Sequence, residues 1–341
     1  MLRRDLLALA LLPGALKSFA AGAPRRPWRI YAITYRGRTA VEDGFVAYFA
    51  ARGIPVEIVW RDIALDPARL PALVDEIRRE RPDLVHTWGT GVTLGIVGRW
   101  DAADRMRYID DIPVVFSLVA APVSTGIVRD LRAPGRAVTG VCHVASLAAQ
   151  VQAMQTYRPF RQVGMLYSLN EPNSLAVLQE LQALGRRQGF TVLGTPFHVD
   201  AAGRTSGQGA VDLVRSLQAA GAGWLYMPPD SFLSTQARET VVPAALAARL
   251  PVFASTEQLM AAGALLGLVS HYYSVGQFAA YKAEQILVDQ VAPARIPVDT
   301  LTRFSLQINL QVARRLQVLP PLGMFNYAEL IGDASATLNP P

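Results

Sequence analysis

The chain has 341 residues, of which 51% are hydrophobic and 18% charged, enough for one or two buried cores. This composition excludes collagen-like, coiled-coil and disulfide-scaffold proteins. The net charge of +6 comes from 33 basic residues, all arginine except Lys17 and Lys282. They are scattered along the chain, which argues against a nucleic-acid partner because such a partner requires a clustered basic surface.

The N-terminal segment has the layout of a secretory signal. Arg3 and Arg4 precede the apolar run 6–12, and small residues fill 20–23. The apolar stretch is about 11 residues long, well short of the roughly 20 that span a bilayer. We therefore predict a signal peptide at 1–23 and export to the periplasm. The arginine pair leaves the twin-arginine and the general export routes both open.

From Trp28 onward, strand-like apolar runs alternate with helical patterns, which indicates parallel sheets covered on both faces. Apolar spacing and stop signals predict the elements of the first half. They are strand 29–34, helix 40–52, strand 56–60, helix 67–80, strand 83–87, helix 91–100 and strand 114–118.

The second half repeats the same rhythm, so two similar α/β units are expected in tandem. It contains strand 162–167, helix 174–187, strand 190–193, helix 209–220, strand 223–227, helix 234–249 and strand 251–254. A final block has an apolar segment 264–270, a helix 275–289 and a strand 304–308, which we expect to complete the sheets. The tail 331–341 is expected to fray.

No residue pattern points to catalysis or to a metal. The only cysteine, Cys142, lies in an apolar run and is expected to be a buried strand residue. The four histidines have no second ligand at metal-binding spacing, although His86 lies at a strand end, where ligands bind in open sheets. No nucleophile elbow and no paired carboxylates are visible. We predict a protein that is not an enzyme and has no cofactor.

A glycine-rich turn follows the third strand. Trp88, Gly89, Thr90 and Gly91 open a helix whose free N–H groups could receive a carboxylate. The spacing GxGxxxG differs from the dinucleotide fingerprint, so a nucleotide site is disfavoured. A ligand-facing helix start and a plain tight turn both stay open.

Two polar clusters follow strands of the second half. The first runs from Asn170 to Ser174, and the second contains Pro229, Asp230 and Ser231. Asn173 or Ser174 in the first cluster, and Asp230 or Ser231 in the second, could simply cap the following helices. Because both clusters lie at carboxyl ends of strands, they are also candidates to line a cleft.

Several segments, taken in order, resemble the ABC-transporter substrate-binding protein family whose better-known members bind aromatic amino acids. They are Ile112–Phe116, Val138–Val141, Val163–Tyr167 with Asn170–Ser174, Leu250–Ser255, Gly263-Ala264, Tyr272-Tyr273 with Gly276, and Ile308-Asn309. The resemblance covers the chain from about Arg29 to Leu319.

The resemblance implies two Rossmann-like α/β lobes of the type I periplasmic-binding-protein architecture, joined by a three-segment hinge with ligand between them. The first lobe would comprise 28–143 and 256–299, and the second 144–255 and 300–330. The chain would thus return to the first lobe near Thr256 and cross again near Thr300. Ligand would close the hinge, and the closed form would dock on a membrane permease.

Two departures from the family pattern bear on the ligand. Ala121 stands where such proteins read aspartate in T-D-P-V, and His271 replaces the aspartate of D-Y-Y. Both changes remove a carboxylate that could neutralise a ligand ammonium group, although Asp230 remains. Arg36 and Arg38, after the first strand, could hold a ligand carboxylate or lie in a solvated loop.

We therefore predict a periplasmic solute-binding protein of an ABC importer. It would be a monomer that captures a small organic acid, aromatic or not. Stacking candidates are Trp88, Tyr272, Tyr273 and Phe232, where packing alone is the alternative. The complete predicted site is Tyr35, Arg36, Trp88, Gly89, Thr90, Gly91, Ala121, Asn170, Asn173, Ser174, Pro229, Asp230, Ser231, Glu257, His271 and Tyr272. The alternative is a periplasmic sensor of the same fold that acts on a signalling partner.

Overall fold

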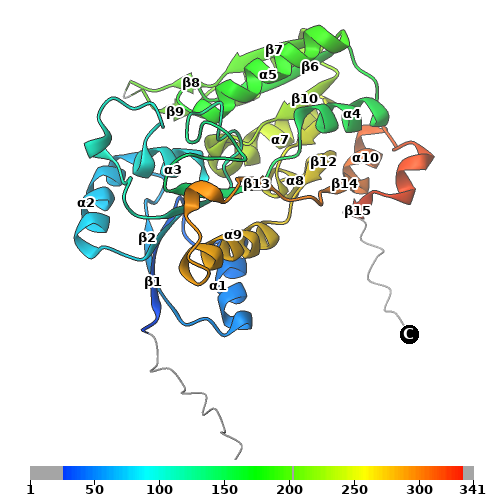
Figure 1. Cartoon of the computed structure of the whole chain (residues 1–341). Helices are drawn as coiled ribbons and strands as arrows, with labels where there is room; N and C mark the ends of the chain where they lie inside the picture. Colours follow the sequence, from blue (N-terminus) through cyan, green and yellow to red (C-terminus); the bar gives the residue numbers. More distant parts are fainter. Residues whose placement is uncertain (1–25, 202, 333–341) are drawn as a thin grey trace, which may run out of the picture.

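The computed structural model describes residues 26–201 and 203–332 (Figure 1). Its two large sheets have the strand orders β13-β5-β4-β3-β1-β2 and β15-β14-β12-β11-β10-β6-β7. All strand pairs in these sheets are parallel except β12 with β14. The two predicted α/β lobes are therefore confirmed, each built on one sheet.

Lobe 1 is formed by the first sheet and the helices beside it. Its elements are β1 Trp28–Thr34, α1 Ala40–Arg52, β2 Val56–Asp62, α2 Leu70–Glu80, β3 Leu84–Trp88, α3 Gly89–Val97, β4 Val114–Ser117, β5 Val138–Cys142, α9 Tyr272–Leu287 and β13 Asp299–Thr300.

Lobe 2 contains the remaining elements. They are α4 Leu147–Tyr157, β6 Gln162–Tyr167, α5 Pro172–Gln188, β7 Thr191–Pro196, the small hairpin β8 His198–Val199 with β9 Thr205–Ser206, α6 Ala210–Ala219, β10 Trp224–Met227, α7 Arg238–Ala247, β11 Val252–Ala254, α8 Glu257–Ala261, β12 Leu266–Val269, β14 Ser305–Asn309, α10 Leu310–Leu316 and β15 Glu329–Ile331.

The chain crosses between the lobes three times, after β5, after β12 and after β13. The expected return to lobe 1 near Thr256 is wrong, because the chain first adds α8 and β12 to lobe 2. β12 pairs with β11 and β14, so its backbone hydrogen bonds can be satisfied only in the second sheet. The return therefore comes after Val269, and α9 is the first element back in lobe 1.

Local signals explain the elements that were placed well. Thr39 and Glu42 form a capping box at the start of α1, and Gly53 ends the helix in the left-handed region at φ 63°. Other boundaries differ because tertiary contacts set them. The predicted helix 234–249 opens as a π-helical turn, Leu233–Ala237, before α7 begins. Cys142 is confirmed as a buried strand residue on β5.

Helix α9 packs directly on α1 (Figure 1). A methyl group added at Gly276 would overlap the backbone carbonyl of Val41, and one at Gly44 would overlap that of Tyr273. The two glycines thus let the helix backbones approach each other. This contact buries Val41 and Phe45 in the core between the helices and the first sheet.

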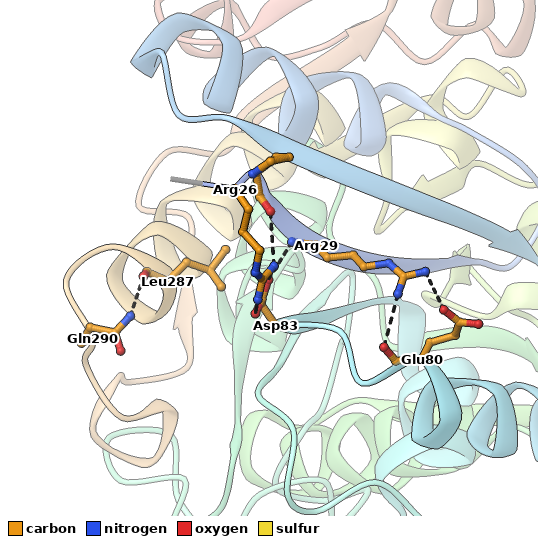
Figure 2. Close-up of polar contacts among 7 residues, drawn as sticks. Arg26, Arg29, Glu80, Asp83, Leu287 and Gln290 are labelled. Carbon is orange, nitrogen blue, oxygen red and sulfur yellow. Dashed lines mark hydrogen bonds and ion pairs between the residues drawn. The ribbon is translucent and has the colours of Figure 1, made fainter. Parts of the chain in front are cut away.

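Two ion pairs hold the amino end of β1 at the edge of lobe 1. Figure 2 shows the Arg26 guanidinium donating to both carboxylate oxygens of Asp83, at 2.8 and 2.7 Å, while Arg29 binds Glu80. The hydrogen bonds from Arg26 lower the pKa of the Asp83 carboxyl. In the same view Gln290 donates to the Leu287 carbonyl after α9. These contacts lie at the amino ends of the strands.

Within residues 26–201 and 203–332, no helix is both long and apolar enough to cross a membrane. The predicted signal peptide 1–23 lies outside this part of the chain, as do residues 333–341 of the predicted tail.

Candidate functional site

A narrow cleft lies between the lobes at the carboxyl edges of their sheets, where open α/β folds bind ligands. Lobe 1 and the connections contribute Trp88, Gly89, Thr90, Leu118, His143 and Tyr272 to its walls; lobe 2 contributes Asn173, Pro229, Asp230, Ser231, Ser234, Thr235, Thr256 and Gln258. The free volume is about 30 Å³, room for about one water molecule.

The wall from lobe 1 is aromatic and cationic. The rings of Tyr35 and Trp88 stack with centroids 5.9 Å apart and planes at 7°. The Arg36 guanidinium lies 5.7 Å from the Trp88 ring centre, within cation–π range. Burial, with the negative charges of Glu171 and Asp230 across the cleft, raises the pKa of Tyr35 to about 12. This wall offers flat rings and one positive charge.

Two unusual backbone conformations shape the same wall. Gly89 has φ +79° at the start of α3, a value that glycine adopts without strain, and it turns the chain from β3 into the helix. Leu118 has φ +57° directly after β4, which costs free energy for a residue with a Cβ. Strained residues of this kind gather at ligand sites.

The wall from lobe 2 is organised by Asp230, which is 0% exposed. Its Oδ1 accepts from Ser168 Oγ at 3.0 Å and Leu233 N at 2.8 Å, and its Oδ2 accepts from Ser168 N at 2.9 Å and Ser174 Oγ at 2.5 Å. These four donors occupy the acceptor positions of a carboxylate. Asp230 therefore caps the helical segment that follows it and fixes the wall.

Glu171 is the second carboxylate of this wall. Its two oxygens accept from the backbone N–H groups of Ser231 and Phe232, both at 2.8 Å. Burial, together with the negative charge of Asp230, raises the pKa of Glu171 to about 8. Burial and the Asp230 charge thus oppose ionisation of this carboxyl, whereas its two backbone donors favour it.

Nine buried side-chain polar atoms of the described residues have no hydrogen-bond partner. Three belong to residues that line the cleft, Trp88 Nε1, His143 Nδ1 and Gln258 Oε1, and two more are the Nε atoms of Arg36, which lies over Trp88, and of Arg238. The other four are on Tyr31, Glu42, His86 and Ser255. Burial of an unsatisfied polar group costs about 1–3 kcal/mol, so each unpaired atom at the cleft is a position where a ligand could bind.

Two arginines, one from each lobe, lie near the cleft and within electrostatic range of each other: Arg36 beside Trp88 and Arg238 directly after the π-helical turn Leu233–Ala237. Burial lowers the pKa of Arg36, and the positive charge of Arg238 lowers it further. Arg238 has one distant carboxylate, Glu239, at 3.8 Å, and Glu239 is largely exposed. The two guanidiniums repel each other, and an anion placed between them would relieve that repulsion.

A π-helical turn positions part of the lobe 2 wall. Leu233–Ala237 is wound with the wider π geometry, and Ser234 and Thr235 from this turn line the cleft. The turn ends directly before Arg238. Such turns recur at functional sites because they redirect the side chains of a helix.

Most of the predicted residues gather at the cleft. Trp88, Gly89, Thr90, Asn173, Pro229, Asp230, Ser231 and Tyr272 line it; Tyr35 and Arg36 contact Trp88, and Ser174 holds Asp230. Glu257 lies behind Tyr272, where its carboxylate accepts from Tyr272 N at 2.9 Å and pairs with His271 Nδ1 at 3.1 Å. His271 itself is exposed.

Other candidates lie away from the cleft wall. Arg38 is exposed, pairs with Asp43 at 3.0 Å and lies over the Trp60 ring, so it follows the solvated-loop alternative. Asn170 is exposed and binds Thr205 at 2.6 Å. Gly91 and Ala121 are not among the lining residues.

His86 and two aromatic candidates also lie away from the cleft wall. His86 is in the middle of β3, buried against Phe45 and bound to Ser117 at 2.9 Å, so the predicted strand-end position is wrong. Burial lowers the pKa of His86 to about 3. Phe232 packs edge-on to Phe197, and Tyr273 is exposed on α9.

Sequence reasoning missed several cleft residues. No sequence motif marks six of the residues that line the cleft, Leu118, His143, Ser234, Thr235, Thr256 and Gln258. The same holds for Arg238, whose Nε is buried without a partner. His143 and Thr256 could have been found from their places near lobe crossings or strand ends. Arg238 could not, because only the π-helical turn determines which way that part of the helix faces. Within 26–201 and 203–332, no three His, Cys, Asp or Glu side chains form a group able to hold a metal ion.

Comparisons with known proteins match this architecture. A tyrosine-binding protein from Clostridioides difficile (strain R20291) is 26% identical over 216 residues, covering 61% of this chain and 58% of that relative, less than two thirds of its length. A conserved domain protein from Vibrio cholerae has a TM-score of 0.77 at 19% identity, covering 89% of this chain and 99% of that structure. An ABC domain from Streptococcus pneumoniae in complex with L-Trp has a TM-score of 0.74 at 21% identity, covering 88% and 99%.

These structural likenesses extend over nearly the whole two-lobed chain and show the fold. The family model described as ABC transporter substrate binding protein matches residues 36–329, which include both lobes and the cleft. The chain therefore belongs to the ABC transporter substrate-binding protein family.

Proposed function

We propose that this protein is the periplasmic receptor of an ABC importer and that it captures a small carboxylate between its lobes. Aromatic carboxylates are the first to test. The observation that carries the ligand class is the pair Arg36 and Arg238, each with a buried Nε that has no partner. A carboxylate could accept hydrogen bonds from both guanidiniums. The stacked rings of Tyr35 and Trp88 offer a flat surface to the rest of the ligand.

The carboxylates of the cleft are poorly suited to a ligand ammonium group. Asp230 is occupied by four protein donors, and Glu257 by Tyr272 N and His271. Both oxygens of Glu171 already accept backbone N–H groups, and burial beside Asp230 raises its pKa. A buried ammonium group would lack a free counter-charge. The absence of a carboxylate at Ala121 and at His271 points the same way.

Capture would proceed by closure of the lobes about the three connections. The Ser270 hydroxyl donates to the His143 carbonyl at 2.7 Å, which ties two of these connections together. The free volume of about 30 Å³ leaves little room between the lobes, which supports the proposal that they separate to admit the ligand. We propose that the open form admits the ligand and that the closed form docks on a membrane permease.

Export and import are also part of the proposal. The arginine pair and apolar run at the N-terminus support export, and the family supports a transport role. A relative that binds tyrosine and a solved structure with L-Trp make aromatic compounds the first set to test.

The test compares three ligands that share one ring but differ in charge. L-Tyrosine carries both charges, 3-(4-hydroxyphenyl)propanoate carries only the carboxylate, and tyramine carries only the ammonium group. The dissociation constants are measured by calorimetry, and the Tm at saturation is recorded. A ligand at 100 times its Kd adds about 2.7 kcal/mol of stability, which raises Tm by about 5 °C or more.

We expect 3-(4-hydroxyphenyl)propanoate to bind at least as tightly as L-tyrosine, and tyramine to bind at least tenfold more weakly than either. Tyramine binding as tightly as the propanoate would refute the carboxylate assignment. Binding of none of these, nor of the indole, phenyl and aliphatic acids tested beside them, would refute the proposed ligand class.

A further inference from the structure

A second cavity lies at the opposite edge of lobe 1 and has a volume of about 370 Å³. Its lining includes the arginines Arg99, Arg105, Arg129 and Arg136, the carboxylate of Asp110 and the ring of Trp100. Helix α3 separates it from the cleft, since Gly89 at one end of the helix faces the cleft and Val97 at the other faces this cavity. Nine helical residues rise about 13 Å. This arginine pocket is therefore distinct from the ligand cleft.

Arg136 forms the inner wall of the arginine pocket. It donates to the carbonyls of Gly98 at 3.0 Å and Ile127 at 3.2 Å, and also to that of Val97. All three partners are neutral carbonyls. Burial lowers the pKa of Arg136, and the positive charge of Arg105 lowers it further. The guanidinium is thus half-buried beside a like charge.

Arg129 and Arg105 are the other two arginines of the pocket that form no ion pair with a described carboxylate. The Arg129 guanidinium lies 4.1 Å from the centre of the Trp100 ring, which holds it flat. Arg105 approaches the Trp100 carbonyl at 3.4 Å. Within residues 26–201 and 203–332, no carboxylate lies within ion-pair distance of Arg105, Arg129 or Arg136.

The carboxylates nearby do not neutralise this group. Asp101 is bound to Arg99 through two hydrogen bonds, of 2.8 and 3.0 Å. Asp110 lines the pocket and partly offsets the charge on Arg136. Asp101 also attracts Arg129. The four arginines of the pocket thus face two carboxylates, Asp101 and Asp110, and the pocket keeps an excess of positive charge. Guanidinium groups recognise phosphoryl oxygens with two parallel hydrogen bonds, and they stack on aromatic rings.

We propose that the arginine pocket binds a phosphoryl group, a doubly charged tetrahedral oxyanion, either as free phosphate or as the headgroup of a small phosphomonoester. Arg129 is held by Trp100 and Arg136 by the backbone, so both donors are positioned before the anion arrives. An anion would balance the excess charge and reduce the cost of burying Arg136. The site is independent of the ligand proposed for the cleft.

The test uses inorganic phosphate and phenyl phosphate, titrated calorimetrically at constant ionic strength set with NaCl. The variant R105Q/R129Q removes two of the cations and leaves Arg136 and its backbone bonds in place. The matched control R107Q/R132Q removes two exposed arginines of the same two segments that do not line the pocket. Each variant loses two positive charges, so the two have the same net charge, and a wild-type circular-dichroism spectrum with a cooperative thermal transition shows that each is folded.

We expect millimolar or tighter binding of at least one probe, a loss of at least tenfold in R105Q/R129Q, and a change within twofold in R107Q/R132Q. Tighter binding of phenyl phosphate would indicate an ester held against Trp100 and Tyr108, and equal binding would indicate phosphate alone. No saturable binding of either probe at 10 mM, or equal losses in both variants, would overturn the proposal. Neither outcome would alter the result for the cleft ligand.

Discussion

The two walls of the cleft use buried charge in opposite ways. On lobe 2, every acceptor position of Asp230 is filled by a protein donor. On lobe 1, Arg36 is also substantially buried, yet its Nε has no partner. A buried charge whose partners are complete stabilises the fold, whereas one with partners missing is available for recognition. The number of unfilled hydrogen-bond positions, rather than charge or burial, separates the two roles.

The largest expected effect is a loss of stability in Asp230→Ala, in the lobe 2 wall. This variant leaves the buried N–H groups of Ser168 and Leu233 unpaired. Each unsatisfied group costs about 1–3 kcal/mol, so stability should fall by about 3 kcal/mol and Tm by about 6–12 °C. Calorimetric unfolding measures this. Asp212→Ala, on the exposed first turn of α6, is the control and should change stability by less than about 0.5 kcal/mol. Similar losses in both variants would contradict the structural role of Asp230.

The role of Arg36 in the lobe 1 wall is tested by Arg36→Gln, which removes the charge while keeping a polar side chain. Hydrogen bonds to charged groups contribute about 1.5–3 kcal/mol, so the Kd for a carboxylate ligand should rise by about 10- to 100-fold with little change in Tm. Arg38→Gln is the matched control, since Arg38 faces solvent two residues away. An unchanged Kd in Arg36→Gln would remove this arginine from the site.

A pH titration of binding sharpens the comparison at Glu171, the second carboxylate of the lobe 2 wall. Its pKa in the folded protein is about 8, above the ordinary 4.5, so the side chain gains its negative charge as pH rises through about 8. Affinity for a carboxylate ligand should therefore fall over that range. Glu171→Gln, which can still accept a backbone hydrogen bond, should flatten the curve. An identical pH profile in the variant would show that Glu171 is not the titrating group.

The smallest effect is expected at the hinge between the walls. Ser270→Ala removes the hydrogen bond to the buried His143 carbonyl, and the loss of one such bond costs about 1 kcal/mol. Tm should fall by about 2–4 °C, as measured by circular dichroism. Ser270→Cys keeps the size of the side chain but weakens the donor, and it should lie between wild type and Ser270→Ala. No change in either variant would mean that this contact does not hold the connections.

The sequence allowed much of the fold to be predicted because local signals agree with tertiary structure in many elements. Thr39, Glu42 and Gly53 define both ends of α1, and apolar runs mark the buried strands. The lobe assignment of 256–269 failed because strand pairing is a long-range property. Nothing within Leu266–Val269 shows that its neighbours will be β11 and β14.

A place at the cleft was predictable where residues follow strand ends and not where it depends on side-chain orientation. Trp88 and Asp230 lie at or just after strand ends and line the cleft, while Asn170 shares such a position but faces Thr205 instead. Asp230 shows a second limit. Its location could be predicted, but its saturation by four donors depends on Ser168 and Ser174, which only the folded chain brings together.

The close packing of α9 on α1 has a consequence for synthesis. Helix α1 is among the first elements translated, but α9, which covers Phe45 and Phe49, follows only after β6 to β12 have been made. A nascent chain that ends before Tyr272 leaves that apolar surface in water, and such surfaces promote aggregation. Lobe 1 is therefore begun first but completed after most of lobe 2, and a truncated lobe 1 should need a chaperone to remain in solution.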